Sequence, residues 1–202
     1  MQNKVQLITY VDRLGGAGIS YLNELAKGPF QGLFGGIHLL PFFNPIDGQD
    51  AGFDPIDHTQ VDPRLGDWSN VRELGKEVGI MADLIVNHVS AQSLPFLAYL
   101  DQGAASEYAG LFLTKEKVFP DGASEAEIAQ IYRPRPGLPF TEFQLADGTL
   151  STLWTTFTAN QIDIDVHSPR GKAYLETILD TFQKAGITMI RLDAAGYAVK
   201  KR

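Results

Sequence analysis

The 202-residue sequence contains no cysteine. Disulfide scaffolds and thiolate metal sites are therefore excluded, and the absence agrees with a reducing compartment, so we expect a cytoplasmic location. The segment up to Tyr10 lacks a long apolar run ahead of a small-residue cleavage site, and no secretory leader is expected. The most apolar stretch, residues 28–43, is interrupted by Pro29, His38 and Pro41, which argues against a membrane span.

Positive charge is also scarce. There are 17 Lys and Arg residues against 24 Asp and Glu residues, which gives a formal net charge of −7. Nucleic-acid binding depends on neutralising phosphates with Lys and Arg, so a nucleic-acid partner is not expected and a small molecule is favoured. With 44% hydrophobic residues the chain can bury a substantial core, as one domain or one domain with an insertion.

Apolar runs typical of buried strands alternate with amphipathic helical patterns. The strands are expected at residues 5–11, 36–43, 80–86 and 187–192, and the helices at 20–27, 69–79 and 171–184. Ser20 and Ser69 are the expected N-caps of the first two helices. The apolar face of the third helix is formed by Tyr174, Leu175, Ile178, Leu179 and Phe182. Such alternation predicts an α/β fold with a parallel sheet and right-handed crossovers.

The alternation fails between His88 and Ser168, where Pro, Gly and aromatic residues are interspersed. A hairpin is expected around Asp147-Gly148. Because so long a structureless loop is implausible in a compact domain, we expect an inserted subdomain at 88–167. Residues 1–87 and 168–202 would then form the main domain.

Ionisable residues follow two of the expected strands. Asp83 to His88 spans the end of the third strand, and Arg191 and Asp193 end the fourth. In a (β/α) barrel, residues past the carboxyl ends of the strands face the substrate. Alternation puts Arg191 and Asp193 on one side, where the cation would keep the carboxylate ionised, as a glycosyl-transfer nucleophile requires. A purely structural Arg–Asp pair, and hydrogen-bonded caps in the Asp83 segment, are the alternatives.

Three blocks of sequence carry a family resemblance. Asp83–His88 resembles the first conserved block of the α-amylase superfamily (glycoside hydrolase family 13), residues 161–165 resemble the block that ends its inserted domain, and residues 191–197 resemble its nucleophile block. The resemblance extends along the whole chain, including residues 41–53 and 132–136, to the branch of glucosyl phosphorylases that act on sucrose. It implies a (β/α)8 TIM barrel, of which this chain would supply the first four strands and a subdomain inserted after the third.

The resemblance implies a catalytic role for two residues. Asp193 would be the nucleophile that forms a covalent β-glucosyl intermediate, and Arg191 would hold it ionised. Asp83 and Asn87 would hold the loop and His88 in place. The acid/base Glu and the stabilising Asp of the family follow later strands, so the chain is expected to be the N-terminal part of a longer enzyme and inactive alone.

The resemblance implies that seven further residues bind substrate. Asp50 and His88 would line the glucosyl subsite with Arg191, Phe53 and Phe157 would form an apolar wall, Gln161 would face the acceptor, and Arg135 with Tyr132 would meet phosphate or fructose. Ordinary core aromatics are the alternative for the two phenylalanines. A solvated turn is the alternative for Arg135.

The reaction that the resemblance implies converts sucrose and phosphate to α-glucose 1-phosphate and fructose by retaining double displacement. No cofactor is expected, since Asp163 and Asp165 alone are a weak metal signal and could equally cap a turn. A homodimer remains open. The alternatives are a related glucosyl phosphorylase or a sucrose hydrolase with another acceptor, and a non-catalytic fragment that binds sugar or serves in assembly.

Overall fold

The computed structural model describes residues 4–14, 16–45 and 50–200. Residues 46–49 of the segment 41–53, and the first three residues of the N-terminal segment, lie outside the described residues. The chain divides into two compact units. The first comprises Met1–Leu84 and Glu176–Asp193, and the second comprises Ile85–Leu175 and Ala194–Arg202.

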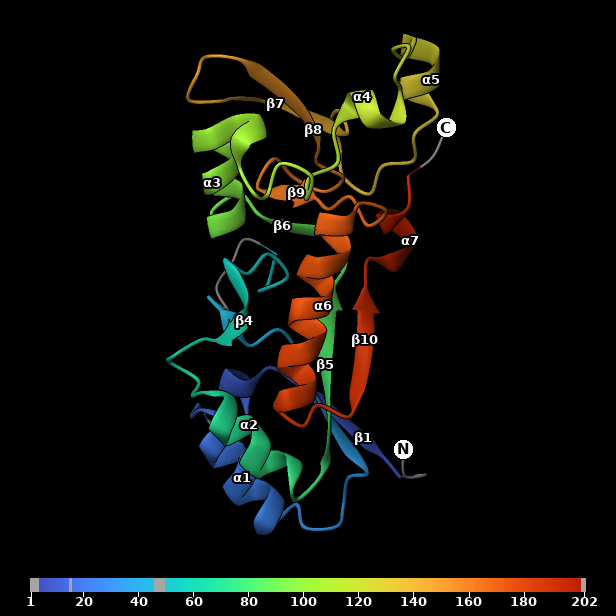
Figure 1. Ribbon diagram of the computed structural model, residues 1–202. Coiled ribbons are helices and arrows are strands. Elements are labelled where there is room, and N and C mark those ends of the chain that lie inside the picture. The colour runs from blue at the N-terminus through green and yellow to red at the C-terminus, as the bar shows by residue number, and fades with distance from the viewer. Residues whose placement is uncertain (1–3, 15, 46–49, 201–202) are drawn as a thin grey trace. The chain divides into compact units, whose positions relative to one another are not determined.

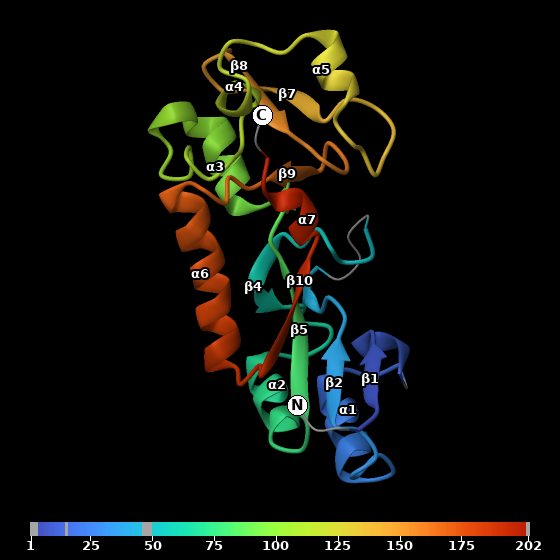
Figure 2. The same ribbon diagram turned by 90° about the vertical axis from the view of Figure 1, so that its right-hand side faces the viewer.

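A four-stranded sheet forms the centre of the first unit. Its strands are β1 (Gln6–Thr9), β2 (Gly36–Leu39), β5 (Gly79–Ile85) and β10 (Met189–Asp193), in the order β1-β2-β5-β10. The pairs β1–β2 and β2–β5 are parallel, and Figure 2 shows the four strands side by side. These are the four strands that the apolar runs predict, and the parallel α/β arrangement is confirmed. β1 and β10 are the outer strands of this sheet.

Two helices, α1 (Ile19–Lys27) and α2 (Trp68–Gly75), pack against each other in this unit. The predicted cap of α1 at Ser20 is wrong: Gly18 precedes the helix, and the Leu65 carbonyl accepts the Ile19 N–H at 2.8 Å. A Cβ on Gly18 would lie 2.2 Å from that carbonyl oxygen, so only glycine allows this approach.

The predicted cap of α2 at Ser69 is wrong as well. Asp67 precedes the helix, and its carboxylate accepts the N–H groups of Ser69 and Asn70 at 2.7 and 3.1 Å. The side chain of Asn70 in turn accepts the N–H of Asp67 at 3.0 Å, which completes a reciprocal capping box. The helix ends at Gly75, four residues earlier than Gly79, where β5 begins.

Short elements complete the first unit: a 3₁₀ helix (Val11–Arg13) and the antiparallel pair β3 (Phe43–Asn44) and β4 (Asp57–Val61). The long helix α6 (Pro169–Lys184) contributes Phe182 to this unit, and its ring stacks on Phe43 at 5.6 Å. Ile178 and Phe182 are buried as predicted, whereas Leu179 is 37% exposed because it lies off the buried stripe.

The second unit contains two antiparallel pairs and several short helices. The pairs are β6 (His88–Ser90) with β9 (Gln161–Asp163), and β7 (Phe140–Gln144) with β8 (Leu150–Trp154). The helices are α3 (Leu94–Gln102), a 3₁₀ turn (Gly103–Ala105), α4 (Lys115–Val118), α5 (Glu125–Ala129) and α7 (Ala195–Ala198), all visible in Figure 1 except the turn.

The β7–β8 hairpin turns at Asp147-Gly148, where Gly148 has φ +86°, so the predicted hairpin is confirmed. The hydrophobic core of the second unit is built around Phe96, Phe112, Leu153 and Ile162. Within the part of the chain that the structure describes, none of the helices combines the length and apolar character needed to cross a membrane.

Candidate active site

Asp83, Arg191 and Asp193 form a linked ion-pair group in the first unit. Nη1 of Arg191 lies 2.5 Å from Oδ1 of Asp83 and 2.9 Å from Oδ1 of Asp193. Asp83 is fully buried, whereas the side chain of Asp193 is 16% exposed. The hydrogen bond to Asp83 raises the pKa of Arg191, and burial lowers this pKa. The negative charges of Asp83 and Asp193 raise it further, so the pKa lies above its usual value. The guanidinium is therefore a permanent cation, and alternation along β10 places Arg191 and Asp193 together, as predicted.

Phe53 and Asp50 lie near this group in the same unit. The guanidinium carbon of Arg191 is 5.6 Å from the centre of the Phe53 ring, a cation–π contact. Asp50 donates its backbone N–H to Asp54 at 3.4 Å. Burial raises the pKa of the Tyr10 phenol, and the negative charges of Asp83 and Asp50 raise it further. The Asp50 carboxylate therefore belongs to the same electrostatic environment as Asp83.

The residue that directly follows Asp50, and the one that directly follows Asp193, have left-handed backbone conformations. Ala51, directly after Asp50, and Ala194, directly after Asp193, each have φ +53°. For a residue with a Cβ this conformation costs on the order of 1 kcal/mol. Backbone strain of this kind is concentrated at functional sites, so these conformations support the predicted roles of Asp50 and Asp193.

A second group of predicted residues gathers in the second unit. The side-chain amide of Gln161 lies 3.1 Å from Nε2 of His88, and the Phe157 ring meets the His88 ring edge-on at 5.4 Å. His88 and Gln161 are buried. The Asn87 amide lies 3.4 Å from Nδ1 of His88, which agrees with its predicted role of holding that ring in place.

Tyr132 joins this group through Tyr197, whereas Arg135 lies in an exposed bend. Tyr197 meets Phe157 edge-on at 5.2 Å and stacks on Tyr132 at 6.2 Å. Burial, followed by the neighbouring Tyr132, raises the pKa of Tyr197. The aromatic series thus connects Phe157 with Tyr132, two residues with predicted substrate contacts.

Lys200 holds the second unit together in a way that the sequence did not reveal. Its ammonium lies 2.6 Å from Oδ2 of Asp163, 3.1 Å from Oδ1 of Asn87 and 2.5 Å from the Tyr197 carbonyl. Asp163 is fully buried and also accepts the Thr156 hydroxyl at 2.5 Å. Asp165 accepts the His167 N–H at 3.0 Å, so the turn-capping alternative is confirmed for this residue.

We expect Lys200→Met to lower the free energy of unfolding by about 3–5 kcal/mol. The variant keeps the apolar stem but leaves the Asp163 carboxylate buried without a cation. Urea denaturation measures the loss, with the exposed Lys172→Met on α6 as a control that should change stability by less than about 0.5 kcal/mol. Adding Asp163→Asn should recover part of the loss, because the unpaired charge is removed. Equal stability of the two lysine variants would contradict the assignment.

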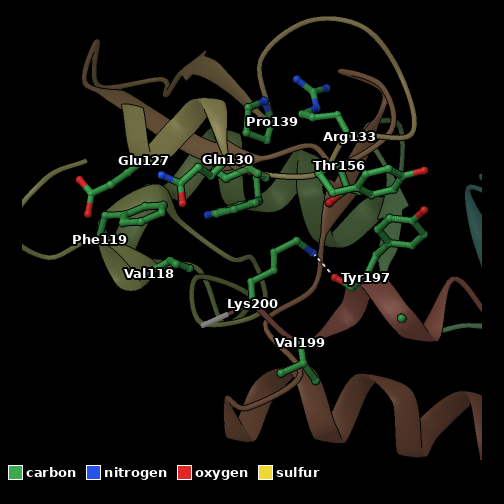
Figure 3. Close-up of a pocket in the computed structure, with 14 residues that line it drawn as sticks. Val118, Phe119, Glu127, Gln130, Arg133, Pro139, Thr156, Tyr197, Val199 and Lys200 are labelled. Carbon is green, nitrogen blue, oxygen red and sulfur yellow. Dashed lines mark hydrogen bonds between the residues drawn. The ribbon is translucent and has the colours of Figure 1, made fainter. Parts of the chain in front are cut away.

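A pocket of about 520 Å³ opens beside this cluster (Figure 3), and its lining includes Tyr132, Arg133, Trp154 and Tyr197. Nε and Nη1 of Arg133, and Nε1 of Trp154, are buried and have no hydrogen-bond partner among the described residues. Burial lowers the pKa of Arg133, although the charge of Asp163 acts in the opposite direction. Arg133 and Trp154 line the pocket, but the three donor atoms themselves are buried.

Within residues 4–14, 16–45 and 50–200, no group of three or more His, Cys, Asp or Glu side chains is placed to hold a metal ion. The carboxylate at Asp163 is occupied by Lys200, and Lys117 pairs with Asp165. These contacts give the two aspartates structural partners.

Sequence reasoning assigned no role to Lys200, Tyr197, Arg133 or His38. Lys200 and Arg133 look like solvated charges in the sequence, because their partners come from distant segments. His38 carries a signal, since it is a lone ionisable residue inside the apolar strand β2.

A parallel sheet with crossover helices and charged side chains at a strand's carboxyl end is typical of α/β proteins that bind small molecules at that edge of the sheet. The family model described as the α-amylase catalytic domain matches residues 20–202, and the chain belongs to this family.

Three relatives illustrate the similarity. The chain is 63% identical to a sucrose phosphorylase of Agrobacterium vitis and 52% identical to one of Bifidobacterium adolescentis; both matches cover all of this chain but 41% and 40% of the relative. The crystal structure of sucrose 6F-phosphate phosphorylase from Thermoanaerobacter thermosaccharolyticum matches with a TM-score of 0.92 at 38% identity, covering 100% of this chain and 41% of that one. The chain thus spans about two fifths of the length of these relatives.

Proposed function

We propose that the chain is the N-terminal part of a sucrose phosphorylase, which converts sucrose and phosphate to α-glucose 1-phosphate and fructose. The observation that carries the proposal is the Arg191–Asp193 pair at the end of β10, in a chain 63% identical along its length to a sucrose phosphorylase. We further propose that residues 1–87 and 168–202 belong to the catalytic (β/α)8 barrel and that 88–167 form the inserted subdomain.

Asp193 would act as the nucleophile in the first of two displacements. Its carboxylate attacks the anomeric carbon of the glucosyl unit, the bond to the fructosyl oxygen breaks, and that oxygen takes a proton from an acid beyond residue 202. A phosphate oxygen then attacks the anomeric carbon, the ester bond to Asp193 breaks, and the proton of the attacking phosphate returns to the acid. Each step inverts the configuration, so the product retains the α configuration of sucrose.

Arg191 supports this chemistry through charge. Since Asp83 holds the guanidinium by a 2.5 Å contact, the cation is fixed beside Asp193 and keeps the nucleophile ionised. Asp50, Phe53, His88, Phe157 and Gln161 would bind the sugar units, as the resemblance predicts.

A related glucosyl phosphorylase with another acceptor is the second candidate. The relatives include a glucosylglycerol phosphorylase of Marinobacter adhaerens at 35% identity and a glucosylglycerate phosphorylase of Spirochaeta thermophila at the same value. These identities are lower than the 63% identity to the sucrose phosphorylase, which favours sucrose as the substrate.

The proposal can be tested with a chimera that joins this chain to the remaining part of the Agrobacterium vitis relative. With sucrose and phosphate it should release fructose and α-glucose 1-phosphate in equal amounts. Turnover of glucosylglycerol or glucosylglycerate in preference to sucrose would favour the second candidate, and no turnover of any of the three would contradict both.

Arg135→Ala in the chimera should weaken phosphorolysis about tenfold or more while leaving hydrolysis of sucrose nearly unchanged, because water as acceptor needs no counter-charge. Initial rates with and without phosphate give the ratio. Arg133→Ala, two residues away in the same loop, is the matched control. If Arg133→Ala alone showed the selective loss, the phosphate contact would lie at the pocket of Figure 3. Equal losses in both reactions would indicate a structural arginine.

Sucrose, phosphate, glucose 1-phosphate and fructose are the proposed small-molecule partners. A homodimer and a cytoplasmic location stay predictions.

A further inference from the structure

His38 is a buried histidine within the all-buried strand β2. Its Nε2 lies 2.9 Å from Oδ2 of Asp83 on the neighbouring strand β5. The register pairs His38 with Met81, and alternation places Met81 and Asp83 on the same face of the sheet, so the sheet itself fixes this contact.

The chemistry of Asp83 determines the direction of the hydrogen bond. Asp83 is paired with the permanently charged Arg191, so it is an ionised carboxylate that can only accept. His38 must therefore carry its proton on Nε2 and donate it. Both oxygens of Asp83 are then engaged, Oδ2 by His38 and Oδ1 by Arg191.

The contacts form a continuous series that ends at the proposed nucleophile. His38 donates to Asp83, Asp83 accepts from Nη1 of Arg191, and the same Nη1 lies 2.9 Å from Asp193. Arg191 thus divides one nitrogen between two carboxylates. Its position depends on how strongly each of them attracts it.

We propose that His38 is a positioning residue for catalysis, acting through Asp83 and Arg191 to set the geometry and charge of Asp193. By donating to Oδ2 it satisfies one side of the buried Asp83 carboxylate and leaves part of the guanidinium's charge for Asp193. This inference rests on the proposed nucleophilic role of Asp193.

Loss of the donor has a defined consequence. Oδ2 of Asp83 is buried, so without His38 it has an unsatisfied lone pair and the carboxylate attracts Arg191 more strongly. The guanidinium, already 2.5 Å from Oδ1 of Asp83, then turns toward Oδ2 and away from Asp193. A misplacement of about 1 Å in a reacting group costs up to about a hundredfold in rate.

The matched substitutions are His38→Gln and His38→Asn in the chimera described above. The Gln amide nitrogen reaches about the place of Nε2, whereas the shorter Asn side chain places its nitrogen near Nδ1 and cannot reach Asp83. His38→Asn should reduce kcat for glucosyl-enzyme formation about ten- to a hundredfold, with KM for sucrose changed less than about threefold. His38→Gln should restore most of the rate.

His58 provides the control for a merely structural effect. It is also buried, and its Nε2 lies 3.2 Å from the backbone carbonyl of Asp83, so it contacts the backbone of the residue whose side chain His38 contacts. His58→Asn should lower the melting temperature but leave kcat of the folded protein within about twofold. A similar fall in kcat for both Asn variants, or wild-type kcat in His38→Asn, would overturn the positioning role.

Failure of the proposed function can be distinguished from failure of this inference. If Asp193→Asn stayed active, Asp193 would not be the nucleophile, whatever His38 does. Crystal structures of the wild-type chimera and of His38→Asn give an answer independent of activity. Arg191 should lie farther from Asp193 in the variant, and an unchanged Arg191–Asp193 distance would overturn the inference. If His38→Asn fails to fold, a wild-type rate and geometry in His38→Leu would overturn it equally.

Discussion

Asp193→Asn is expected to abolish glucosyl-enzyme formation, with a loss in kcat on the order of ten-thousandfold or more. The amide has nearly the shape of the carboxylate and still accepts a hydrogen bond from Arg191, 2.9 Å away. It lacks the negative charge that attacks the anomeric carbon. Folding should therefore be preserved while the first displacement is blocked.

The measurement is mass spectrometry of the chimera quenched shortly after mixing with sucrose. The wild type should carry one additional hexosyl unit on the peptide that contains Asp193, and the Asn variant should carry none. Asp180→Asn, an exposed carboxylate on α6, controls for the loss of one charge and should behave as wild type. A hexosyl adduct in the Asp193 variant, or normal turnover by it, would assign the nucleophile elsewhere.

The structure explains why the strands could be predicted but the helix caps could not. Strands such as β2 and β5 are apolar runs bounded by glycine, a local signal that survives in any tertiary context. The start of α1 depends instead on the Leu65 carbonyl, 46 residues from Ile19 and near it only in the folded chain. A serine at the right spacing cannot compete with a backbone partner that the fold supplies.

The candidate site likewise contains contacts that the local sequence predicts and contacts that only the folded chain creates. Arg191 and Asp193 are two residues apart on one strand, so alternation alone brings them together, and the 2.9 Å ion pair agrees with that expectation. His38 and Asp83 are 45 residues apart, and Lys200 and Asn87 are 113 apart. Those contacts depend on strand order, register or the path of the chain, which no local pattern specifies.

Substitutions of the predicted substrate-binding residues are expected to act by different routes. The residues concerned are Asp50, Phe53, His88 and Gln161. His88 and Gln161 are buried and in contact, so either substitution would disturb the other. Phe53 contacts the Arg191 guanidinium, so its loss would act through charge as well as through the apolar wall. Comparing kcat with KM for each variant separates these routes.

The polypeptide of residues 1–202 alone is expected to release fructose from sucrose at a rate at least about a hundred- to ten-thousandfold below that of the chimera. Retaining glycosyl transfer needs a second carboxyl group to protonate the leaving oxygen, and loss of general-acid assistance alone costs that factor. The sheet adds a second reason. Its outer strands β1 and β10 expose Ile8 at 62%, Ile190 at 40% and Leu192 at 58%, surfaces that favour pairing with other chains.

Light scattering coupled to gel filtration, together with the fructose assay, tests both parts of this expectation. The isolated polypeptide should elute as oligomers or aggregates, and the chimera should elute as a defined species because its added strands cover the edges of the sheet. Replacing Ile190 and Leu192 by Lys should reduce association of the isolated polypeptide without creating activity, since solubility does not supply an acid. A monodisperse monomer of residues 1–202 that turned over sucrose at the chimera's rate would show that its own carboxylates suffice for both roles, and Asp193 would then have to be reassigned together with its partner.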